Sequence, residues 1–312
     1  MMKLYKSQNG KIKEVNEMGK DIWINLVNPN EEEIALITNH FSIDAEDIRA
    51  SLDNEEYSRV ESFKDYSLIL VDVPLKEIRH ENNAYTTLPL SIIFNDTYII
   101  TTSLKDTGIL NPFFEGTGYY NTAKRMRLIY QILYRIAVVY QTYLRLIDHK
   151  RREMESELNN RTKKSDLIQL HELESNLVYF AMSLRANDIV LHKLLSSDKL
   201  ERYSEDLELL NDTMIENRQA IEMTNIYRSV LSGTRELFAS ILDNNLNTVM
   251  KLMTSVTLIM SIPTVISGFY GMNVNGKSIP FAASPNAFIY ITIATLFICA
   301  IIALILKKKD ML

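Results

Sequence analysis

Short alternating runs of apolar and polar residues characterise the first hundred positions of the chain. In residues 21–26 every second residue is apolar, and part of residues 66–73 has the same period of two, which is typical of half-buried strands. Residues 91–94 and 98–102 are two further strand-like runs, and the turn-forming residues 95–97 between them predict a hairpin. The pattern therefore predicts a sheet in the first part of the chain.

Helical spacing dominates the rest of the chain. One helix is expected among the strands, over residues 31–40, because a proline and an asparagine precede it. From about residue 121, apolar residues recur at intervals of three and four, which indicates long helices with breaks at residues 159–160 and 196–198. Residues 204–269 contain a single proline and two glycines, so they can form one helix of roughly 100 Å at about 1.5 Å per residue.

Two uncharged segments lie near the end of the chain. There are 25 uncharged residues between Lys251 and Lys277, and 29 between Lys277 and Lys307. Within them, residues 252–269 and 287–306 are mostly apolar, and each is close to the ~20 residues that a helix needs to cross a bilayer. The alternative, a buried hairpin of a soluble protein, is disfavoured because both segments are long and carry no charge. Two membrane spans are therefore predicted.

The charges are distributed unevenly along the 312 residues. The whole chain is 46% hydrophobic and 23% charged, with a net charge of −5. Residues 251–312 hold five lysines and one aspartate, a net charge of +4, which leaves −9 for residues 1–250. The basic cluster Lys307, Lys308 and Lys309 follows the second span, so the positive-inside rule predicts that both termini are cytoplasmic and that residues 274–286 lie outside.

Composition also excludes several functions. An acidic soluble part lacks the basic surface expected of a nucleic-acid-binding protein, so no nucleic-acid partner is predicted. A single cysteine excludes a disulfide framework or a cysteine-rich zinc site. No apolar run opens the chain, so no signal peptide is predicted. The sequence has no phosphate-binding loop, nucleophile elbow or pair of histidines at zinc spacing, and no enzymatic activity is predicted.

A polar stripe runs along the first predicted span. Its members are separated by 3, 4, 3, 4, 3 and 4 residues, which places them on one side of a helix. Close helix packing is one explanation, since small hydroxyl residues are common at membrane helix interfaces. The stripe continues upstream into carboxylates, which packing does not require, so a path for water and ions explains it better. The stripe comprises Asn247, Met250, Thr254, Thr257, Ser261, Thr264 and Gly268, and upstream Asp243, Ser240, Glu236, Gly233 and Ser229.

The first span ends in the sequence Tyr270-Gly271-Met272-Asn273. With this motif the chain resembles the CorA family of magnesium transporters, whose Gly-Met-Asn signature follows the first of two C-terminal spans. The resemblance covers the whole layout: an α/β N-terminal domain, long helices, two spans and a terminal lysine cluster. An ordinary helix C-cap and turn would explain Gly271 and Asn273 taken alone.

The resemblance implies a homopentamer in which five copies of the first span line a pore and Asn273 rings its outer mouth. Asn247, Met250 and Thr264 match pore-lining positions of the family. A ring of neutral amide oxygens suits Mg²⁺, because this ion gives up its water shell reluctantly and the amides can accept hydrogen bonds from that shell. Gly271 is expected to allow the sharp exit from the helix that this ring requires.

Two departures from the family pattern concern charged residues. Many members carry an acidic residue in the outer connector, whereas this chain has only Lys277. Asp212 matches one carboxylate of a regulatory metal site between subunits, and an ordinary surface aspartate is the alternative. The usual acidic partner aligns near Arg49 and Ala50, so a substitute is sought among neighbouring carboxylates, namely Asp47 or Asp53.

The predicted fold class is an α+β cytoplasmic domain followed by long α-helices and two C-terminal transmembrane helices. The predicted function is magnesium uptake through a homopentameric channel of the cell membrane, gated by cytoplasmic Mg²⁺. A transporter of zinc, cobalt or nickel is the alternative. A membrane-anchored scaffold without transport is a third hypothesis, but it would leave the polar stripe unexplained. Predicted partners are the lipid bilayer and divalent cations, with Mg²⁺ as transported ion and candidate regulator. The expected segments are 1–120 (α/β domain), 121–246 (stalk), 247–270 (first span), 271–286 (connector), 287–306 (second span) and 307–312 (basic tail).

Overall fold

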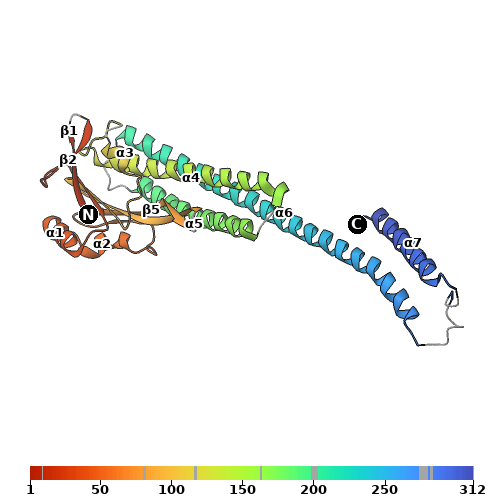
Figure 1. Ribbon diagram of the computed structural model, residues 1–312. Helices are drawn as coiled ribbons and strands as arrows, with labels where there is room; N and C mark the ends of the chain where they lie inside the picture. The colour runs from red at the N-terminus through yellow and green to blue at the C-terminus, as the bar shows by residue number, and fades with distance from the viewer. Residues whose placement is uncertain are drawn as a thin grey trace. The chain divides into compact units, whose positions relative to one another are not determined.

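The computed structural model divides into two compact units, Met1–Arg235 and Glu236–Leu312, which are described separately (Figure 1). The first contains a sheet and most of the helices, and the second contains the apolar helices. The structure describes all residues except 9, 80–81, 116–117, 162–163, 198–202, 274–279, 282–283 and 312.

A seven-stranded sheet forms the centre of the first unit, with the strand order β2-β1-β3-β7-β6-β5-β4. β3 and β7 are parallel, and the other neighbouring strands are antiparallel. The expected strands at residues 21–26, 66–73, 91–94 and 98–102 are confirmed as β3, β5, β6 and β7. The strands are β1 (Met2–Gln8), β2 (Lys11–Val15), β3 (Ile22–Val27), β4 (Arg59–Ser62), β5 (Ser67–Arg79), β6 (Asn82–Phe94) and β7 (Tyr98–Ser103).

The predicted hairpin between β6 and β7 is confirmed. The two strands pair antiparallel with Phe94 opposite Ile99. Asn95 Oδ1 accepts hydrogen bonds from the Thr97 backbone N at 2.8 Å and the Tyr98 backbone N at 3.2 Å. An asparagine side chain that bonds to the backbone two residues later stabilises a tight turn, so the local sequence is sufficient to fix this connection.

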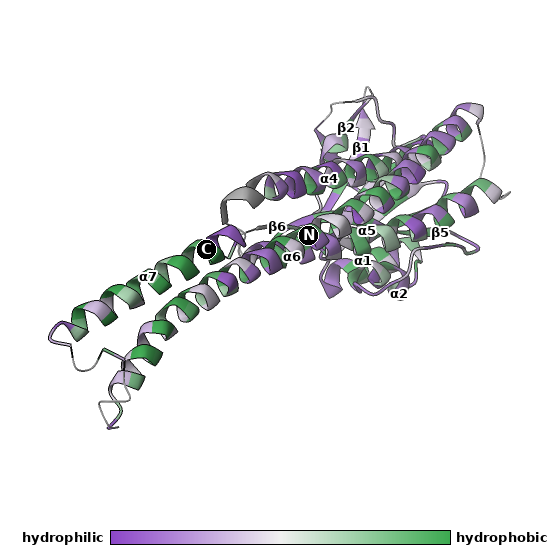
Figure 2. Ribbon diagram, turned by 90° about the vertical axis from the view of Figure 1, so that its right-hand side faces the viewer, coloured by the Kyte–Doolittle hydropathy of each residue, from purple (hydrophilic) through white to green (hydrophobic). Residues whose placement is uncertain are grey.

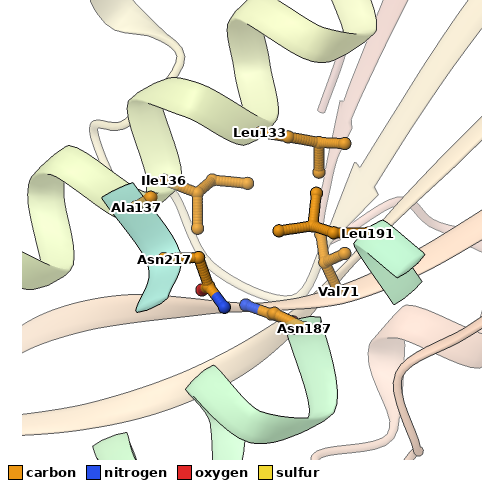
Figure 3. Close-up of a pocket in the computed structure, with 7 residues that line it drawn as sticks. All are labelled: Val71, Leu133, Ile136, Ala137, Asn187, Leu191 and Asn217. Atoms are coloured by element: carbon orange, nitrogen blue, oxygen red, sulfur yellow. The ribbon is translucent and has the colours of Figure 1, made fainter. Parts of the chain in front are cut away.

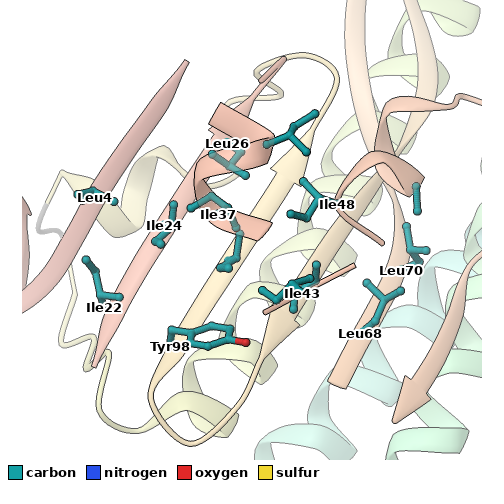
Figure 4. Packing of buried hydrophobic residues seen from close by; sticks show 14 residues of the cluster. Leu4, Ile22, Ile24, Leu26, Ile37, Ile43, Ile48, Leu68, Leu70 and Tyr98 are labelled. Atoms are coloured by element: carbon teal, nitrogen blue, oxygen red, sulfur yellow. The ribbon is translucent and has the colours of Figure 1, made fainter. Parts of the chain in front are cut away.

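Short helices cover one face of the sheet: α1 (Glu31–Phe41), α2 (Ala45–Arg49) and the 3₁₀ turn η1 (Ala50–Leu52). α1 starts at a capping box, in which Asn30 Oδ1 accepts from Glu33 N at 2.8 Å and Glu33 Oε2 accepts from Asn30 N at 3.0 Å. The expected helix at residues 31–40 is therefore confirmed. The core beneath these helices (Figure 4) is made by Leu4, Ile22, Ile24, Leu26, Ile34, Ile37, Ile43, Ile48, Ala50, Leu68, Leu70, Ile93, Tyr98 and Ile100.

Longer helices cover the other face. They are α4 (Arg125–Arg161) and α5 (Lys164–Ser196), and the short α3 (Asn111–Phe114) precedes them. The side chain of Trp23 is completely buried near α3, where its ring lies edge-on to Phe113 at 5.8 Å between centroids and its Nε1 donates to Thr101 Oγ1 at 2.9 Å. α4 ends one residue beyond the expected break, and α5 ends at the start of the second expected break.

The long helix α6 (Ser204–Tyr270) is attached to α4 and α5 along its first half. Arg127 Nη1 lies 2.9 Å from Glu205 Oε2, Gln141 Nε2 donates to the Glu216 carbonyl at 3.0 Å, and Asn217 Nδ2 donates to the Leu184 carbonyl at 3.1 Å. A cavity of about 10 Å³ remains where the three helices meet β5 (Figure 3). It is lined by Val71, Leu133, Ile136, Ala137, Asn187, Leu191 and Asn217.

The packing of α1 gives the first testable prediction. Ile37 is fully buried whereas its neighbour Leu36 is 46% exposed, so Ile37→Ala should lower the free energy of unfolding by about 2–5 kcal/mol and Leu36→Ala by less than about 1 kcal/mol. The single tryptophan of the chain, Trp23, lies in the first unit and reports its unfolding by fluorescence during a urea titration. Equal losses in the two variants would contradict the described orientation of α1.

Candidate functional site

Two helices of the chain are long and apolar enough to cross a membrane, namely α6 and α7 (Ala287–Lys308). Figure 2 shows apolar residues along α7 and along the second half of α6. Few of these residues are buried within the chain, and large side chains such as Phe288, Leu296 and Leu304 are more than half exposed. Exposed apolar surface on this scale requires lipid or other helices to cover it.

α7 lies beside one face of α6, as both views show (Figures 1 and 2). On that face Ser255 is fully buried, and Ile259, Ile262 and Ile266 are partly buried. Their spacing of four, three and four residues defines a single side of the helix. This side, hereafter the α7-facing side, is the part of the second half of α6 that the chain itself shields.

A proline interrupts the hydrogen bonding of α6 on this side. Pro263 lies inside the helix and has no N–H to offer the carbonyl of Ile259, four residues earlier. The thiol of Cys299, on α7, lies 3.7 Å from that carbonyl oxygen and donates to it. The neighbouring helix thus supplies a weak donor to the carbonyl freed by the proline, which matters where no water is available.

The predicted polar stripe lies on another side of α6. At about 100° per residue, its centre is about 140° around the helix axis from the α7-facing side. All of its members are exposed in the single chain, including the upstream residues. The structure therefore leaves the following residues uncovered: Asn247, Met250, Thr254, Thr257, Ser261, Thr264 and Gly268, with Asp243, Ser240, Glu236, Gly233 and Ser229 before them.

The hydroxyl groups of the stripe have a defined orientation. Thr257 Oγ1 donates to the Met253 carbonyl at 2.8 Å, and Thr264 Oγ1 donates to the Met260 carbonyl at 3.0 Å. Ser261 Oγ donates to a carbonyl of its own helix in the same way, at 2.8 Å. Because each hydroxyl proton is used within the helix, the outward side of each oxygen offers lone pairs only. Thr257, Ser261 and Thr264 therefore present hydrogen-bond acceptors on the outward side of the stripe.

The Tyr-Gly-Met-Asn motif lies directly at the end of α6. Tyr270 Oη donates to the Pro280 carbonyl at 3.0 Å, and Gly271 N donates to the Ser267 carbonyl at 2.9 Å. Asn273 is exposed. Residues 274–279 and 282–283 of the predicted connector, Lys277 among them, lie outside the described residues.

Gly271 has a different constraint from the one expected. Its φ lies outside the left-handed region, so the exit from the helix does not depend on the conformational freedom of glycine. A Cβ atom at this position would lie 3.2 Å from the Ser267 carbonyl oxygen, which is tighter than an ordinary contact. A side chain at position 271 would therefore crowd the last turn of α6.

The candidate regulatory carboxylates are dispersed in the single chain. Asp212 is exposed on α6. Asp47 accepts a hydrogen bond from Tyr66 Oη at 2.5 Å, and Asp53 Oδ1 accepts one from Glu55 N at 3.0 Å. Within the described part of the chain, no three histidine, cysteine or acidic side chains are close enough together to hold a metal ion.

The region near Arg49 is held by local interactions. Arg49 pairs with Glu31 at 2.5 Å. Burial raises the pKa of the Asp47 carboxyl, and burial together with the hydrogen bond to Asp47 raises the pKa of Tyr66 to about 12. Asp47 is thus half-buried and already engaged, whereas Asp53 and Asp212 are open to solvent.

Two residues of the membrane helices were missed by the sequence analysis, Ser255 and Cys299. Ser255 lies outside the stripe, on the apolar side of α6. A polar residue at an otherwise apolar position was the feature of the sequence that could have indicated this contact. Cys299 is unremarkable in sequence, since its role depends on the position of Pro263 in the other helix. Neither interaction follows from the spacing of residues along one helix.

The chain combines an α/β unit with two apolar helices, and the first of these helices has an uncovered polar face. This arrangement defines a membrane protein of the two-span transporter class. Residues 19–308 match the family described as CorA-like Mg²⁺ transporter protein. The chain belongs to this family, and the resemblance noted in the sequence is confirmed. The predicted fold class is confirmed as well.

Individual relatives agree with this assignment. The chain is 29% identical over 301 residues to the cobalt/magnesium transport protein CorA of Methanocaldococcus jannaschii, covering 92% of this chain and 90% of the relative. It is 23% identical over 258 residues to the protein of the same name from Thermotoga maritima, covering 80% and 72%. The complete structure of the CorA magnesium transporter from M. jannaschii superposes with a TM-score of 0.82 at 25% identity, covering 98% and 96%. These relatives are metal ion transporters and not enzymes.

Proposed function

We propose that this chain takes up Mg²⁺ across the cell membrane as a homopentameric channel, driven by the membrane potential and the ion gradient. The observation that carries the proposal is the polar stripe of α6, which lies away from the α7-facing side. Polar side chains are costly in contact with lipid. The stripe therefore requires a polar environment that the chain alone does not provide.

A symmetric ring of subunits provides that environment. Two spans cannot enclose a pore, but copies arranged around an axis can turn the stripe of each α6 toward the centre. α7 then lies outside α6 and faces lipid, in keeping with its predominantly apolar and mostly exposed side chains. The resemblance to the CorA family favours five copies.

The acceptors of the stripe match a hydrated cation. Mg²⁺ holds its water shell tightly, and the protons of those waters point outward. Hydroxyl groups that offer lone pairs only, as those of Thr257, Ser261 and Thr264 do, can accept from these protons without displacing the water. The Asn273 amides act in the same way at the outer mouth.

The lysines set the proposed orientation. Lys251 and the cluster Lys307, Lys308 and Lys309 flank the two spans on the same side, which the positive-inside rule assigns to the cytoplasm. Residues 1–246 and 307–312 are then cytoplasmic, and residues 271–286 form the external connector. The proposed functional segments keep the boundaries expected from the sequence, with 247–270 as pore helix and 287–306 as second span.

Cobalt is the second candidate ion. The relatives from M. jannaschii and T. maritima are named as cobalt/magnesium transport proteins. Zinc and nickel remain alternatives within the same architecture, and comparison of uptake rates for the four ions in liposomes separates them. A membrane-anchored scaffold without transport would give no flux of any of them.

The stripe gives the second prediction. Replacing Thr257 and Thr264 by valine keeps the shape of each side chain but removes its acceptor, so Mg²⁺ uptake into liposomes should fall by about fivefold or more. The matched control is Thr292→Val on α7, whose hydroxyl bonds to the Phe288 carbonyl at 2.8 Å and which lies away from the proposed pore. Unchanged uptake in the double variant would mean that the stripe does not line the ion path.

The third prediction concerns the outer ring. Asn273→Ala should abolish uptake while leaving assembly intact, because the ring loses its amide acceptors. Asn286→Ala is the control: Asn286 is also exposed and outside the helices, and its side chain makes no capping hydrogen bond to α7. Normal uptake by Asn273→Ala would remove the filter assignment.

The charge of the soluble part suggests how the channel is gated. Residues 1–250 carry a net charge of −9, and copies of this part repel one another around a ring unless cations lie between them. Mg²⁺ bound there, with Asp212 as a ligand and Asp47 or Asp53 as candidate partners, stabilises a closed ring when internal Mg²⁺ is ample. Asp53 is the more accessible candidate, since Asp47 is bonded to Tyr66.

The fourth prediction tests this gate by limited proteolysis. Protection of the soluble part should increase with millimolar Mg²⁺, and Asp212→Asn should weaken the increase because a charged ligand is replaced by a neutral one. Glu222→Gln, another exposed carboxylate of α6, serves as the control and should leave it unchanged. Identical protection with and without Mg²⁺ would contradict the gating scheme while leaving the pore assignment in place.

A further inference from the structure

The turn that follows α7 has a specific geometry. Asp310 adopts a left-handed conformation with φ of 52°, its N–H donates to the Lys307 carbonyl at 3.3 Å, and the N–H of Met311 donates to the Leu306 carbonyl at 3.1 Å. These two bonds and the left-handed residue define a Schellman motif, a compact way to end a helix. Residues 309–311, hereafter the terminal turn, are therefore an ordered element.

The terminal turn is bonded to α6. Ser255 Oγ donates to the Met311 carbonyl at 2.7 Å, across 56 positions of sequence. Other hydroxyls of the membrane helices, such as those of Thr257, Thr264 and Thr292, donate instead to a carbonyl of their own helix. Ser255 thus forgoes the local bond available to a helical serine and makes a tertiary one.

The buried residues of the two apolar helices lie next to the terminal turn. From residue 247 onward, the described residues that are buried are Ser255, at 0% exposure, and Leu306, at 7%. The terminal turn touches both, since Met311 N bonds to Leu306 and Met311 O bonds to Ser255. The remaining α7-facing side chains of α6 are only partly covered, so the terminal turn is the best-defined contact between the two helices.

We propose that the terminal turn is a latch that locks α7 to α6 at their lysine-rich end, with Ser255 as the positioning residue. The latch stays closed during transport, so that the two helices move as one body. The proposal rests on the Mg²⁺ transport function proposed above. It also fixes Lys307, Lys308 and Lys309 at the last turn of α7, where positive charge is favourable to the helix dipole.

Cross-linking tests the position of the latch in the full-length protein. In a Cys299→Ser background, which keeps a donor to the Ile259 carbonyl, Ser255→Cys combined with Met311→Cys should form a link within one subunit on oxidation or with a short bis-maleimide. The matched control pairs Met311→Cys with Val256→Cys, whose side chain points about 100° further around the helix. Equal yields for the two pairs would overturn the latch.

Measurements of Mg²⁺ uptake test the role of the latch. Ser255→Ala should lower Mg²⁺ uptake by about fivefold, because one buried hydrogen bond that positions α6 is lost. Ser267→Ala should have little effect, since Ser267 bonds only within its own helix. In the reduced state the Ser255→Cys/Met311→Cys protein keeps only a weak thiol donor and should be slower than the Cys299→Ser parent, and oxidation should restore its uptake. Loss of uptake on oxidation would overturn the proposal, because it would mean that the helices separate during transport.

The backbone of the terminal turn provides a test that spares Ser255. Asp310→Gly should preserve uptake, because glycine adopts the left-handed conformation without strain. Asp310→Val should lower uptake as Ser255→Ala does, since a β-branched residue is strained there. Equal uptake by the two variants would count against the latch.

The outcomes separate this proposal from the proposed function. If the unmodified protein shows no Mg²⁺ flux, the transport assignment fails, and selective cross-linking of residues 255 and 311 in the Cys299→Ser background still decides whether the latch exists. If the parent transports Mg²⁺ and the selective link does not form, the latch fails and the transport assignment stands.

Discussion

A helix that crosses hydrocarbon must shield each polar side chain it carries, and α6 carries more of them than one neighbouring helix can cover. α7 covers one side, with Ser255 at its lysine-rich end. The stripe from Asn247 to Gly268 lies about 140° away and stays uncovered in the single chain. This imbalance supports the proposed assembly around an axis, in which the stripes of several copies would face one another.

The soluble unit holds the first half of α6. The sheet has a core on each face, one under α1 and α2 and the other under α4 and α5. α6 joins the second of these layers through polar contacts from Arg127, Gln141 and Asn217, rather than through the sheet itself. These contacts fix the position of the first half of α6 relative to α4 and α5.

Features that depend on local pattern were predictable from the sequence. Lack of charge over a long stretch identified both apolar helices, and the scarcity of helix breakers predicted α6 to within one residue at its end. The hairpin of β6 and β7 followed from its turn residues. By contrast, β1 and β2 are short and rich in polar residues, and only their pairing with each other and with β3 makes them strands.

Features that depend on contacts between distant segments were not predictable. Nothing in the spacing of residues links Ser255 to Met311 or Cys299 to Ile259, because each bond needs both helices in place. The stripe could be recognised within one helix, but its surroundings in the proposed ring involve other copies of the chain. The same holds for a partner of Asp212 in the proposed metal site, since the carboxylates near Arg49 are occupied locally or exposed.

Pro263 has a mechanical consequence for α6. Pro263 removes one internal hydrogen bond, and the Cys299 thiol that takes the place of the missing N–H group is a weak donor. α6 is therefore more compliant at this point than elsewhere along its length. On one side of this joint, Ser255 anchors α6 to the terminal turn; on the other, the last two turns lead to Asn273. In the proposed ring, the end of α6 that carries Asn273 would therefore tilt more readily than the end held by Ser255, and the ring at the outer mouth would adjust its diameter to the hydrated ion.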